Sequence, residues 1–343
     1  MNRNGYDPYR GRSRFRTFLK ALIVLLLVLL VLSVAALFWL EPCIDYSAGG
    51  IRIHLPFSQP QEPEETGAQV VVTTPEASPT PTPLAEAEFR AVLLPNTALY
   101  DGTAAERLSQ AGANAAVFDM KADDGSLGYL SQLELPLRAG LNPEDPSLNA
   151  AIQLLGEGDM YTVARVSCFR DNTAPRYENG QAIHVSGGNW RDSDGCRWLS
   201  PASAEARQYV AGVCQELAAL GFDEILLENW SFPIGGERIL SDGNYPADAL
   251  SSQVEAFLAE VRSALAGYPE VRLSLATTAA AASGGAPESG QTTALLEAAD
   301  RVAVSLAAGE RLPDLGDTPV VPVLAQPGEA DSNWIVLPES PEF

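Results

Sequence analysis

From residue 89 to the C-terminus, short apolar runs alternate with helix-like stretches, and this alternation constrains the fold more than any other feature of the chain. Continuously apolar runs between helices are typical of parallel strands that helices cover. Eight such units in about 250 residues match a (β/α)8 TIM barrel of the α/β class. We predict strands at 89–94, 115–120, 162–169, 224–227, 271–276, 301–306, 320–324 and 334–337, and helices at 104–111, 147–155, 202–220, 246–266 and 292–299.

The last crossovers are too short for full helices, so we expect shortened C-terminal crossovers. An open, doubly wound sheet is the alternative fold. The first predicted strand is followed by PNTALYDG and not by a G-x-G-x-x-G motif. The sequence therefore indicates no nucleotide cofactor, and we predict none of any kind.

The N-terminal region carries an almost unbroken apolar stretch at 19–40. About 20 helical residues at ~1.5 Å each span roughly 30 Å, the thickness of one bilayer core. Residues 1–20 hold six basic residues and one acidic residue, which predicts a basic cytoplasmic tail at 1–18 and an extracellular remainder. We predict an uncleaved transmembrane signal-anchor helix at 19–40. The alternative is a cleaved signal peptide, whose apolar region would be shorter and end at small residues rather than at Phe38-Trp39-Leu40.

Residues 41–87 join this span to the predicted barrel at 88–343. An alternating piece at 51–55 can form a small strand, whereas residues 56–87 are rich in Pro, Glu, Thr and Ser and favour a disordered linker. The chain has a net charge of −22, and because the first 20 residues carry +5, the remainder carries −27. So acidic a body argues against nucleic-acid partners, which bind basic surfaces.

The chain has four cysteines and two histidines but no C-x-x-C pair, so we predict no metal site. Cys168 and Cys196 are both expected near the loop after one strand, and outside the membrane they could form a disulfide. Buried, unpaired thiols are the alternative.

The stretch GFDEILLENWSFP at 221–233 ends a predicted strand with Glu228, Asn229 and Trp230. Catalytic residues of TIM barrels lie at this C-terminal end of the strands. A carboxyl group against the Trp230 indole, in a partly dry pocket, would have a raised pKa, as a proton donor requires.

Asp119 and Lys121 end the second predicted strand, and Lys121 is the only lysine beyond Lys20. Residues two apart share one face of a strand, so we expect both side chains to point the same way and the ammonium to lower the pKa of Asp119. Such a carboxylate suits a base or a charge stabiliser. A structural ion pair at the barrel rim is the alternative.

The third predicted strand contributes Arg165, with Asp171 just beyond it, and the long loop that follows holds Trp190 and Trp198. Flat aromatic faces suit sugar rings, although both tryptophans could instead pin the loop to the barrel. The predicted substrate-binding residues are Lys121, Arg165, Asp171, Trp190, Asn229 and Trp230.

Four segments resemble the putative glycosyl hydrolase domain family DUF4015: VFDMKADDGSLGY at 117–129, TVARVSCFRDNTAP at 162–175, the Trp190…WLSP stretch ending at 201, and GFDEILLENWSFP. The resemblance implies a TIM barrel related to α-amylase-type hydrolases. The chain also departs from the family. Ser231 stands where the family typically has Arg, and the ends of the fifth and sixth strands lack the acidic residue and the Pro-Met-x-Tyr-Pro-Ser motif that the family tends to carry.

Glycoside hydrolysis uses two carboxyl groups, ~5–5.5 Å apart in retaining enzymes and ~6.5–9.5 Å apart in inverting ones. Asp119 and Glu228 come from strands two apart, which favours the wider separation. We predict a membrane-anchored, extracellular hydrolase of cell-surface or environmental polysaccharide, with Glu228 as proton donor and Asp119 as base or stabiliser. The alternative is a degenerate barrel that binds glycan or cell-envelope polymer without cleaving it.

Overall fold

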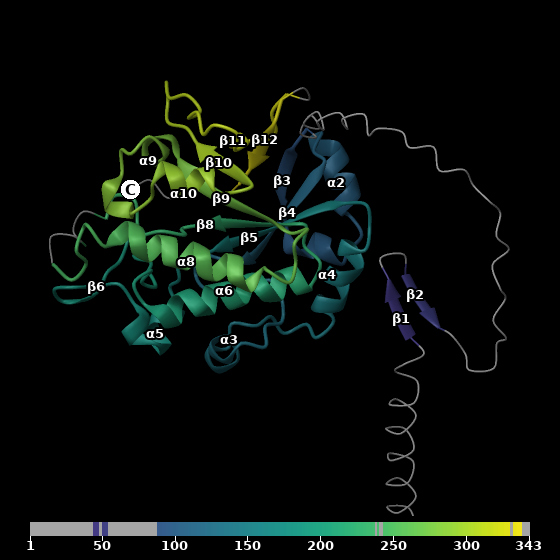
Figure 1. Cartoon of the computed structure of the whole chain (residues 1–343), viewed down its shortest axis with the longest axis horizontal. Helices are drawn as coiled ribbons and strands as arrows, with labels where there is room; N and C mark the ends of the chain where they lie inside the picture. The colour runs from purple at the N-terminus through teal and green to yellow at the C-terminus, as the bar shows by residue number, and fades with distance from the viewer. Residues whose placement is uncertain are drawn as a thin grey trace, which may run out of the picture. The chain divides into compact units, whose positions relative to one another are not determined.

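The computed structural model describes residues 44–47, 50–53, 88–236, 239, 243–329 and 332–337. Its barrel strands are β3 (Arg90–Leu94), β4 (Ala115–Lys121), β5 (Tyr161–Ser167), β8 (Glu224–Glu228), β9 (Arg272–Thr278), β10 (Arg301–Ser305), β11 (Val320–Leu324) and β12 (Trp334–Val336). These eight strands pair in parallel, each with the next along the chain (Figure 1). The ring closes because β12 pairs with β3, with Trp334 opposite Arg90. The predicted TIM barrel is confirmed, and the open sheet is wrong.

Every predicted helix is present. The longer helices are α2 (Ala104–Ala111), α4 (Leu148–Gly156), α6 (Ala204–Ala219) and α8 (Leu250–Ala264). Shorter ones are α3 (Glu134–Ala139), α5 (Ala174–Tyr177), α9 (Ala279–Ala282) and α10 (Thr293–Glu297). Between β10 and β11, and between β11 and β12, the described residues contain no helix. The expected shortening of the C-terminal crossovers is therefore confirmed.

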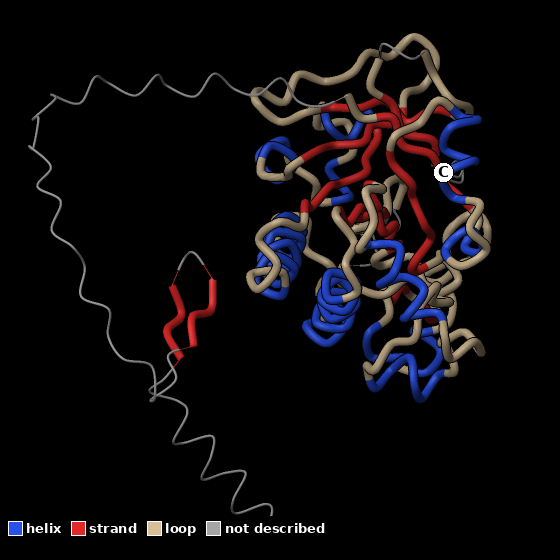
Figure 2. Tube along the Cα trace, turned by 90° about the vertical axis from the view of Figure 1, so that its right-hand side faces the viewer, coloured by secondary structure: helices blue, strands red, loops and turns tan. Residues whose placement is uncertain are grey.

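The strands separate two hydrophobic cores. Inward-facing side chains such as Val117, Val163 and Leu226 fill the middle of the barrel. Their neighbours on the other face, such as Phe118 and Val166, pack under the helices. Helices α6 and α8 lie side by side along one flank of the barrel (Figures 1 and 2). Because the apolar core occupies the middle of the barrel, polar inward-facing residues are confined to its two ends.

Near the N-terminus, β1 (Ile44–Ser47) and β2 (Gly50–Ile53) form an antiparallel pair, which includes part of the strand predicted at 51–55. The predicted tail at 1–18, the predicted transmembrane helix at 19–40 and most of the predicted linker lie outside the described residues. Within the part that is described, no helix combines the length and the apolar character needed to cross a bilayer.

The three described cysteines, Cys168, Cys196 and Cys214, are buried free thiols, so the disulfide between Cys168 and Cys196 does not form. The Cys168 thiol donates to the Val166 carbonyl at 3.5 Å, and the Cys196 thiol donates to the Asp123 carbonyl at 3.3 Å. Each sulfur therefore has its own polar partner, and the alternative of unpaired thiols is the correct one.

Candidate active site at the C-terminal end of the barrel

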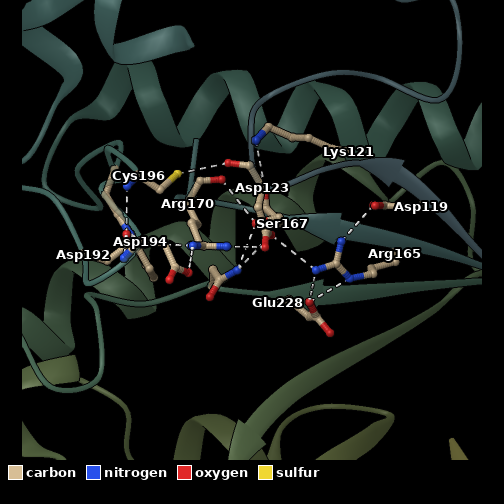
Figure 3. A network of polar contacts seen from close by, with 12 residues as sticks. Asp119, Lys121, Asp123, Arg165, Ser167, Arg170, Asp192, Asp194, Cys196 and Glu228 are labelled. Atoms are coloured by element: carbon tan, nitrogen blue, oxygen red, sulfur yellow. Dashed lines mark hydrogen bonds and ion pairs between the residues drawn. The ribbon is translucent and has the colours of Figure 1, made fainter. Parts of the chain in front are cut away.

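Arg165 on β5 is the centre of a polar network at the C-terminal ends of β4, β5 and β8 (Figure 3). Its Nε and Nη2 contact Glu228 Oε2 at 2.7 and 2.5 Å, and its Nη1 contacts Asp119 Oδ1 at 2.9 Å. Two carboxyl groups bound to one guanidinium lie within roughly 8 Å of each other, the reach of two hydrogen bonds across that group. The structure thus places Asp119 near Glu228, as the sequence led us to expect, and it places Arg165, predicted to bind substrate, between the two acids.

Asp123, just beyond β4, joins Arg165 to a second arginine and was not among the predicted site residues. Its Oδ1 lies 3.3 Å from Arg165 Nη2, and its Oδ2 lies 2.5 Å from Arg170 Nη1. Arg170 also pairs with Asp192 at 2.7 Å and Asp194 at 2.8 Å (Figure 3). The sequence feature that could have identified Asp123 is the acidic pair Asp123-Asp124 in the loop after a barrel strand, because barrel enzymes place their sites in these loops.

Lys121 does not share a face with Asp119, because a β-bulge interrupts β4 between them. Asp119 lies opposite Arg165 while Lys121 lies opposite Val166, so Met120 is an extra residue in the ladder. An extra residue reverses the face on which all later side chains lie. Lys121 consequently turns toward the outer core, and the predicted pairing with Asp119 is wrong.

The true partner of Lys121 is Asp171, at 2.9 Å, and both side chains are fully buried. The Lys121 ammonium also donates to the Ser167 carbonyl at 2.8 Å. Asp171 Oδ1 in turn accepts hydrogen bonds from the backbone amides of Thr173 and Ala174, at the start of α5. These two residues, predicted to bind substrate, instead form an ion pair that fixes the loop after β5.

The predicted tryptophans are also buried. The Trp230 indole is fully covered and donates to the Ala276 carbonyl at 2.8 Å. Trp190 packs edge-on against Trp198, with ring centroids 6.0 Å apart, and Trp198 donates to Asp192 at 3.1 Å. Neither Trp190 nor Trp230 offers a free face to a sugar ring, so the alternative of a pinned loop describes this region better.

Asn229 lies at the turn after β8 and has a φ of 50°, in the left-handed region. Asn tolerates this region better than most residues. Its side-chain amide donates to Ser167 Oγ at 2.9 Å. Asn229 and Glu228 both line a cleft over the C-terminal end of the barrel.

This cleft encloses about 600 Å³ of open space, solvent included. Its other walls come from the ends of β9, β10 and β11, at residues such as Thr278, Ser305 and Val323. Ser231, which replaces the Arg typical of the family, accepts a hydrogen bond from the Gln291 amide at 2.9 Å. The described part of this side of the cleft thus carries no charged side chain and combines hydroxyl and amide groups with apolar residues such as Ala276 and Val323.

Burial is the main electrostatic influence on the paired carboxyl groups. It raises the pKa of Glu228, and the charge of Arg165 and its hydrogen bonds only partly oppose this shift. Burial likewise raises the pKa of Asp119, again against the effect of Arg165. The raised pKa of Glu228 matches the prediction, whereas the predicted lowering for Asp119 is wrong because burial outweighs the charges of Arg165 and Lys121.

Asp123 shifts in the opposite direction. Burial alone would raise its pKa, but the charge of Arg165, a hydrogen bond involving Ser167 and the charge of Arg170 together hold the pKa below its usual value. Neighbouring carboxyl groups whose pKa values are driven apart are typical of acid and base pairs. The site therefore combines two carboxyl groups whose pKa values are raised with one whose pKa is lowered.

Within the described residues, no group of three or more His, Cys, Asp or Glu side chains is arranged to hold a metal ion. Between Asp119 and Glu228, the position that a cation would take is filled by the Arg165 guanidinium.

A closed (β/α)8 barrel with paired carboxyl groups at its C-terminal end defines a glycosidase-like protein. The chain belongs to the family described as "Putative glycosyl hydrolase domain" (DUF4015), whose family model matches residues 103–303. The resemblance noted in the sequence is therefore confirmed. No curated protein matches the chain.

Several solved structures are similar in fold. A hypothetical protein from Ruminiclostridium thermocellum is 25% identical, over 54% of this chain and 96% of that one, with a TM-score of 0.44. The PgaB (BpsB) glycoside hydrolase domain from Bordetella bronchiseptica is 16% identical, over 64% of this chain and 74% of that one, with a TM-score of 0.47. The glycoside hydrolase domain of PelA from Pseudomonas aeruginosa is 15% identical, over 69% and 83%, with a TM-score of 0.39.

Proposed function

We propose that the barrel is a glycoside hydrolase that acts on cell-surface or environmental polysaccharide. Family membership supports this proposal. The observation that carries it is the placement of Asp119 and Glu228 on one guanidinium, with Glu228 beside the cleft. In this mechanism, Glu228 gives its proton to the glycosidic oxygen as the bond to the anomeric carbon breaks. Asp119, once ionised, accepts a proton from the attacking water or stabilises the positive charge on the sugar ring.

Arg165 has a positioning role in this proposal. Its three nitrogens hold both carboxyl groups in fixed places, and it remains cationic because the surrounding carboxylates raise its pKa against the effect of burial. A fixed positive charge between the two acids also prevents their mutual repulsion from separating them. Removal of Arg165 would therefore disturb both catalytic groups together.

The second candidate function is glycan binding without cleavage. Two observations favour it. The proposed donor Glu228 already accepts two hydrogen bonds from Arg165 on one oxygen, and the β9–β11 side of the cleft contributes no carboxyl group. A barrel that has lost catalysis but kept its cleft would have these features.

The test compares the Glu228→Gln and Asp119→Asn variants with the wild type, all as full-length proteins. Reducing-end release and glycan binding are measured on the same panel of polysaccharides. Glu157→Gln is the matched control, because Glu157 is exposed and lies just after α4, at the opposite end of the barrel. We expect each site variant to keep its glycan binding but to lose at least about 10²-fold in the rate of release. This factor is the lower end of the range for acid–base catalysis. Binding without release, unchanged in Glu228→Gln, would instead establish the second function.

We also propose that the protein is a single-pass membrane protein, with residues 1–18 in the cytoplasm and the barrel outside. The support is the apolar stretch at 19–40 and its basic N-terminal flank. Sequencing the N-terminus of the protein isolated from cell membranes tests this placement. An N-terminus that begins after residue 35 would show cleavage rather than anchoring.

A further inference from the structure

The inward-facing side chains at the C-terminal end of the barrel form two unlike halves. One half holds the charged groups Asp119, Arg165 and Glu228. The other half, at the ends of β9 and β10, holds Thr278 and Ser305, which pair in register. Each of these five residues lies two positions after a residue of the inner core and therefore shares its face. Thr278, Ser305 and Glu228 line the same cleft, so a sugar that reaches Glu228 lies beside the uncharged half.

Gln291 adds an amide group to this uncharged half. Its Oε1 accepts a hydrogen bond from Thr277 Oγ1 at 2.6 Å, and its Nε2 donates to Ser231 Oγ at 2.9 Å. Because an amide nitrogen carries two hydrogens, one N–H of Gln291 has no acceptor among the described residues. Gln291 is only 9% exposed, yet it lines the cleft. A buried donor of this kind is satisfied when a ligand or water accepts its hydrogen.

The loop that carries Gln291, just before α10, is fixed to the loop after β8. The Phe232 backbone amide donates to the Ser289 carbonyl at 3.1 Å, and the Gly235 amide donates to Glu288 Oε1 at 2.9 Å. The backbone amide of Gln291 donates to Ser289 Oγ at 3.2 Å. The open N–H of Gln291 is therefore held in place before any ligand arrives, which is what a selective binding group requires.

The two hydroxyl groups of this half also have unused hydrogen-bonding capacity. Thr278 Oγ1 accepts from the Ala281 amide at 3.1 Å, and its own hydrogen has no acceptor in the described part of the chain. The Ser305 hydroxyl is half-buried and bonds to no described residue. Apolar Val323 and Leu337 line the cleft next to these groups. Sugars match such a surface, because their hydroxyl groups both donate and accept hydrogen bonds while their C–H faces are apolar.

We infer that Gln291 and Ser305 are specificity-determining residues, which bind hydroxyl groups of an uncharged sugar beside Glu228. This inference rests on the proposed glycoside hydrolase or glycan-binding function and names its substrate class, neutral polysaccharide. A sugar that carries a carboxylate would find no cation among the described side chains that line the cleft. Burying a charge without a partner is costly, so the cleft rejects such a sugar.

The test is calorimetric binding to the full-length protein of oligomers of glucose, galactose and N-acetylglucosamine. Each oligomer is compared with its C6-oxidised counterpart, which carries a carboxylate on each sugar. We expect at least one neutral oligomer to bind, and to bind at least about 10-fold more tightly than its oxidised counterpart. Equal affinity within every pair, tighter binding of the oxidised oligomers, or no binding of any neutral oligomer would overturn the inference.

Ser305→Ala removes a hydroxyl group that bonds to no described residue, so it should leave the stability of the fold unchanged. We expect it to weaken binding of the neutral oligomer about 3- to 10-fold, the usual effect of one hydrogen bond. Ser305→Thr keeps a hydroxyl group and should restore the affinity. Ser109→Ala is the matched control, because Ser109 is exposed on α2 and does not line the cleft. Unchanged affinity in Ser305→Ala would contradict the role of Ser305.

Gln291→Leu removes the amide group at similar size, and we expect it to weaken binding of the neutral oligomer at least about 10-fold. It also takes a partner from Thr277 and Ser231, so denaturant unfolding is measured in parallel. A purely structural role predicts lower stability with unchanged affinity of the folded protein, and that result would contradict the role of Gln291. If this variant does not fold, Ser305→Ala decides the inference.

Reducing-end release, measured on the same oligomers, separates this inference from the hydrolase proposal. Preferred binding of a neutral oligomer without release supports the inference and contradicts hydrolysis. Faster release from the oxidised oligomers supports hydrolysis and contradicts the inference.

Discussion

The two ends of the barrel interior both carry buried ionic groups, but the balance of charge differs. At the N-terminal end, Glu224 pairs with Arg301 and also accepts hydrogen bonds from Ser274 at 2.5 Å and Tyr161 at 2.8 Å. Both oxygens of this carboxylate are used. At the C-terminal end, Asp119, Asp123 and Glu228 share Arg165, and oxygens of the first and last remain open.

This difference in charge balance distinguishes an end of the barrel that stabilises the fold from an end that is suited to binding a ligand. A carboxylate whose charge is neutralised and whose oxygens all accept hydrogen bonds has no oxygen available for a ligand. In TIM barrels this N-terminal end contributes to stability. An acidic cluster with too few cations is unfavourable for the folded protein and is typical of sites that are completed by a substrate. The same kind of substitution should therefore have opposite effects on stability at the two ends.

The largest effect is expected at the N-terminal end. Glu224→Gln removes the carboxylate that pairs with the buried Arg301, and breaking a buried ion pair in this way costs about 3–5 kcal/mol of unfolding free energy. Denaturant unfolding of the full-length protein, followed by tryptophan fluorescence, measures the loss. The same substitution at the C-terminal end, Glu228→Gln, is the matched control. A loss below about 1 kcal/mol for Glu224→Gln would remove the contrast between the two ends.

The Lys121–Asp171 pair sharpens the comparison, because it lies near the C-terminal end but has balanced charges. Lys121→Met leaves Asp171 as an uncompensated buried charge and should cost about 3 kcal/mol. Adding Asp171→Asn removes that charge and should recover part of the loss. If Lys121→Met were neutral for folding and instead weakened glycan binding, Lys121 would belong to the binding site after all.

Glu228→Gln should raise the free energy of unfolding at neutral pH, whereas Glu224→Gln lowers it. A group whose pKa is raised by folding stabilises the protein below its unfolded value, about 4.3 for Glu, and loses this contribution as pH rises through the folded value. Glutamine does not ionise, so the variant avoids that loss. We expect it to match the wild type near pH 4 and to be about 1 kcal/mol more stable at pH 7.

Asp123→Asn provides the contrast within the same site. Because the pKa of Asp123 is lowered, its stabilisation is present above about 3.9, the unfolded value, and is lost as pH falls through the folded value. Asp123→Asn should therefore destabilise the protein at pH 7 while Glu228→Gln does not. Unfolding curves from about pH 3 to 8 distinguish the two. If the stability of both variants changed with pH in the same way, the opposite pKa shifts assigned to Glu228 and Asp123 would be contradicted.

Local sequence patterns predicted the strands, the helices and the meeting of Asp119 with Glu228, because apolar runs and barrel topology determine where strand ends lie. They could not place Lys121, since one extra residue at Met120 reverses the face and no local pattern marks it. The burial of Trp230 depends on a hydrogen bond to Ala276, a residue that is distant in sequence. Asp123 was missed because its role depends on Arg170 and the folding of the loop after β5.

The smallest expected effect tests whether backbone strain also concentrates at the C-terminal end. Asn229 is the only non-glycine residue with positive φ among the described residues. Asn229→Ala and Asn229→Gly both remove the hydrogen bond to Ser167, but only alanine is strained at a φ of 50°. The two variants should therefore differ by about 1 kcal/mol in unfolding free energy, with glycine the more stable, because a left-handed conformation costs an alanine roughly that much. Equal stabilities would mean that the turn relaxes, and that Asn229 is required for its amide contacts beside the cleft rather than for its conformation.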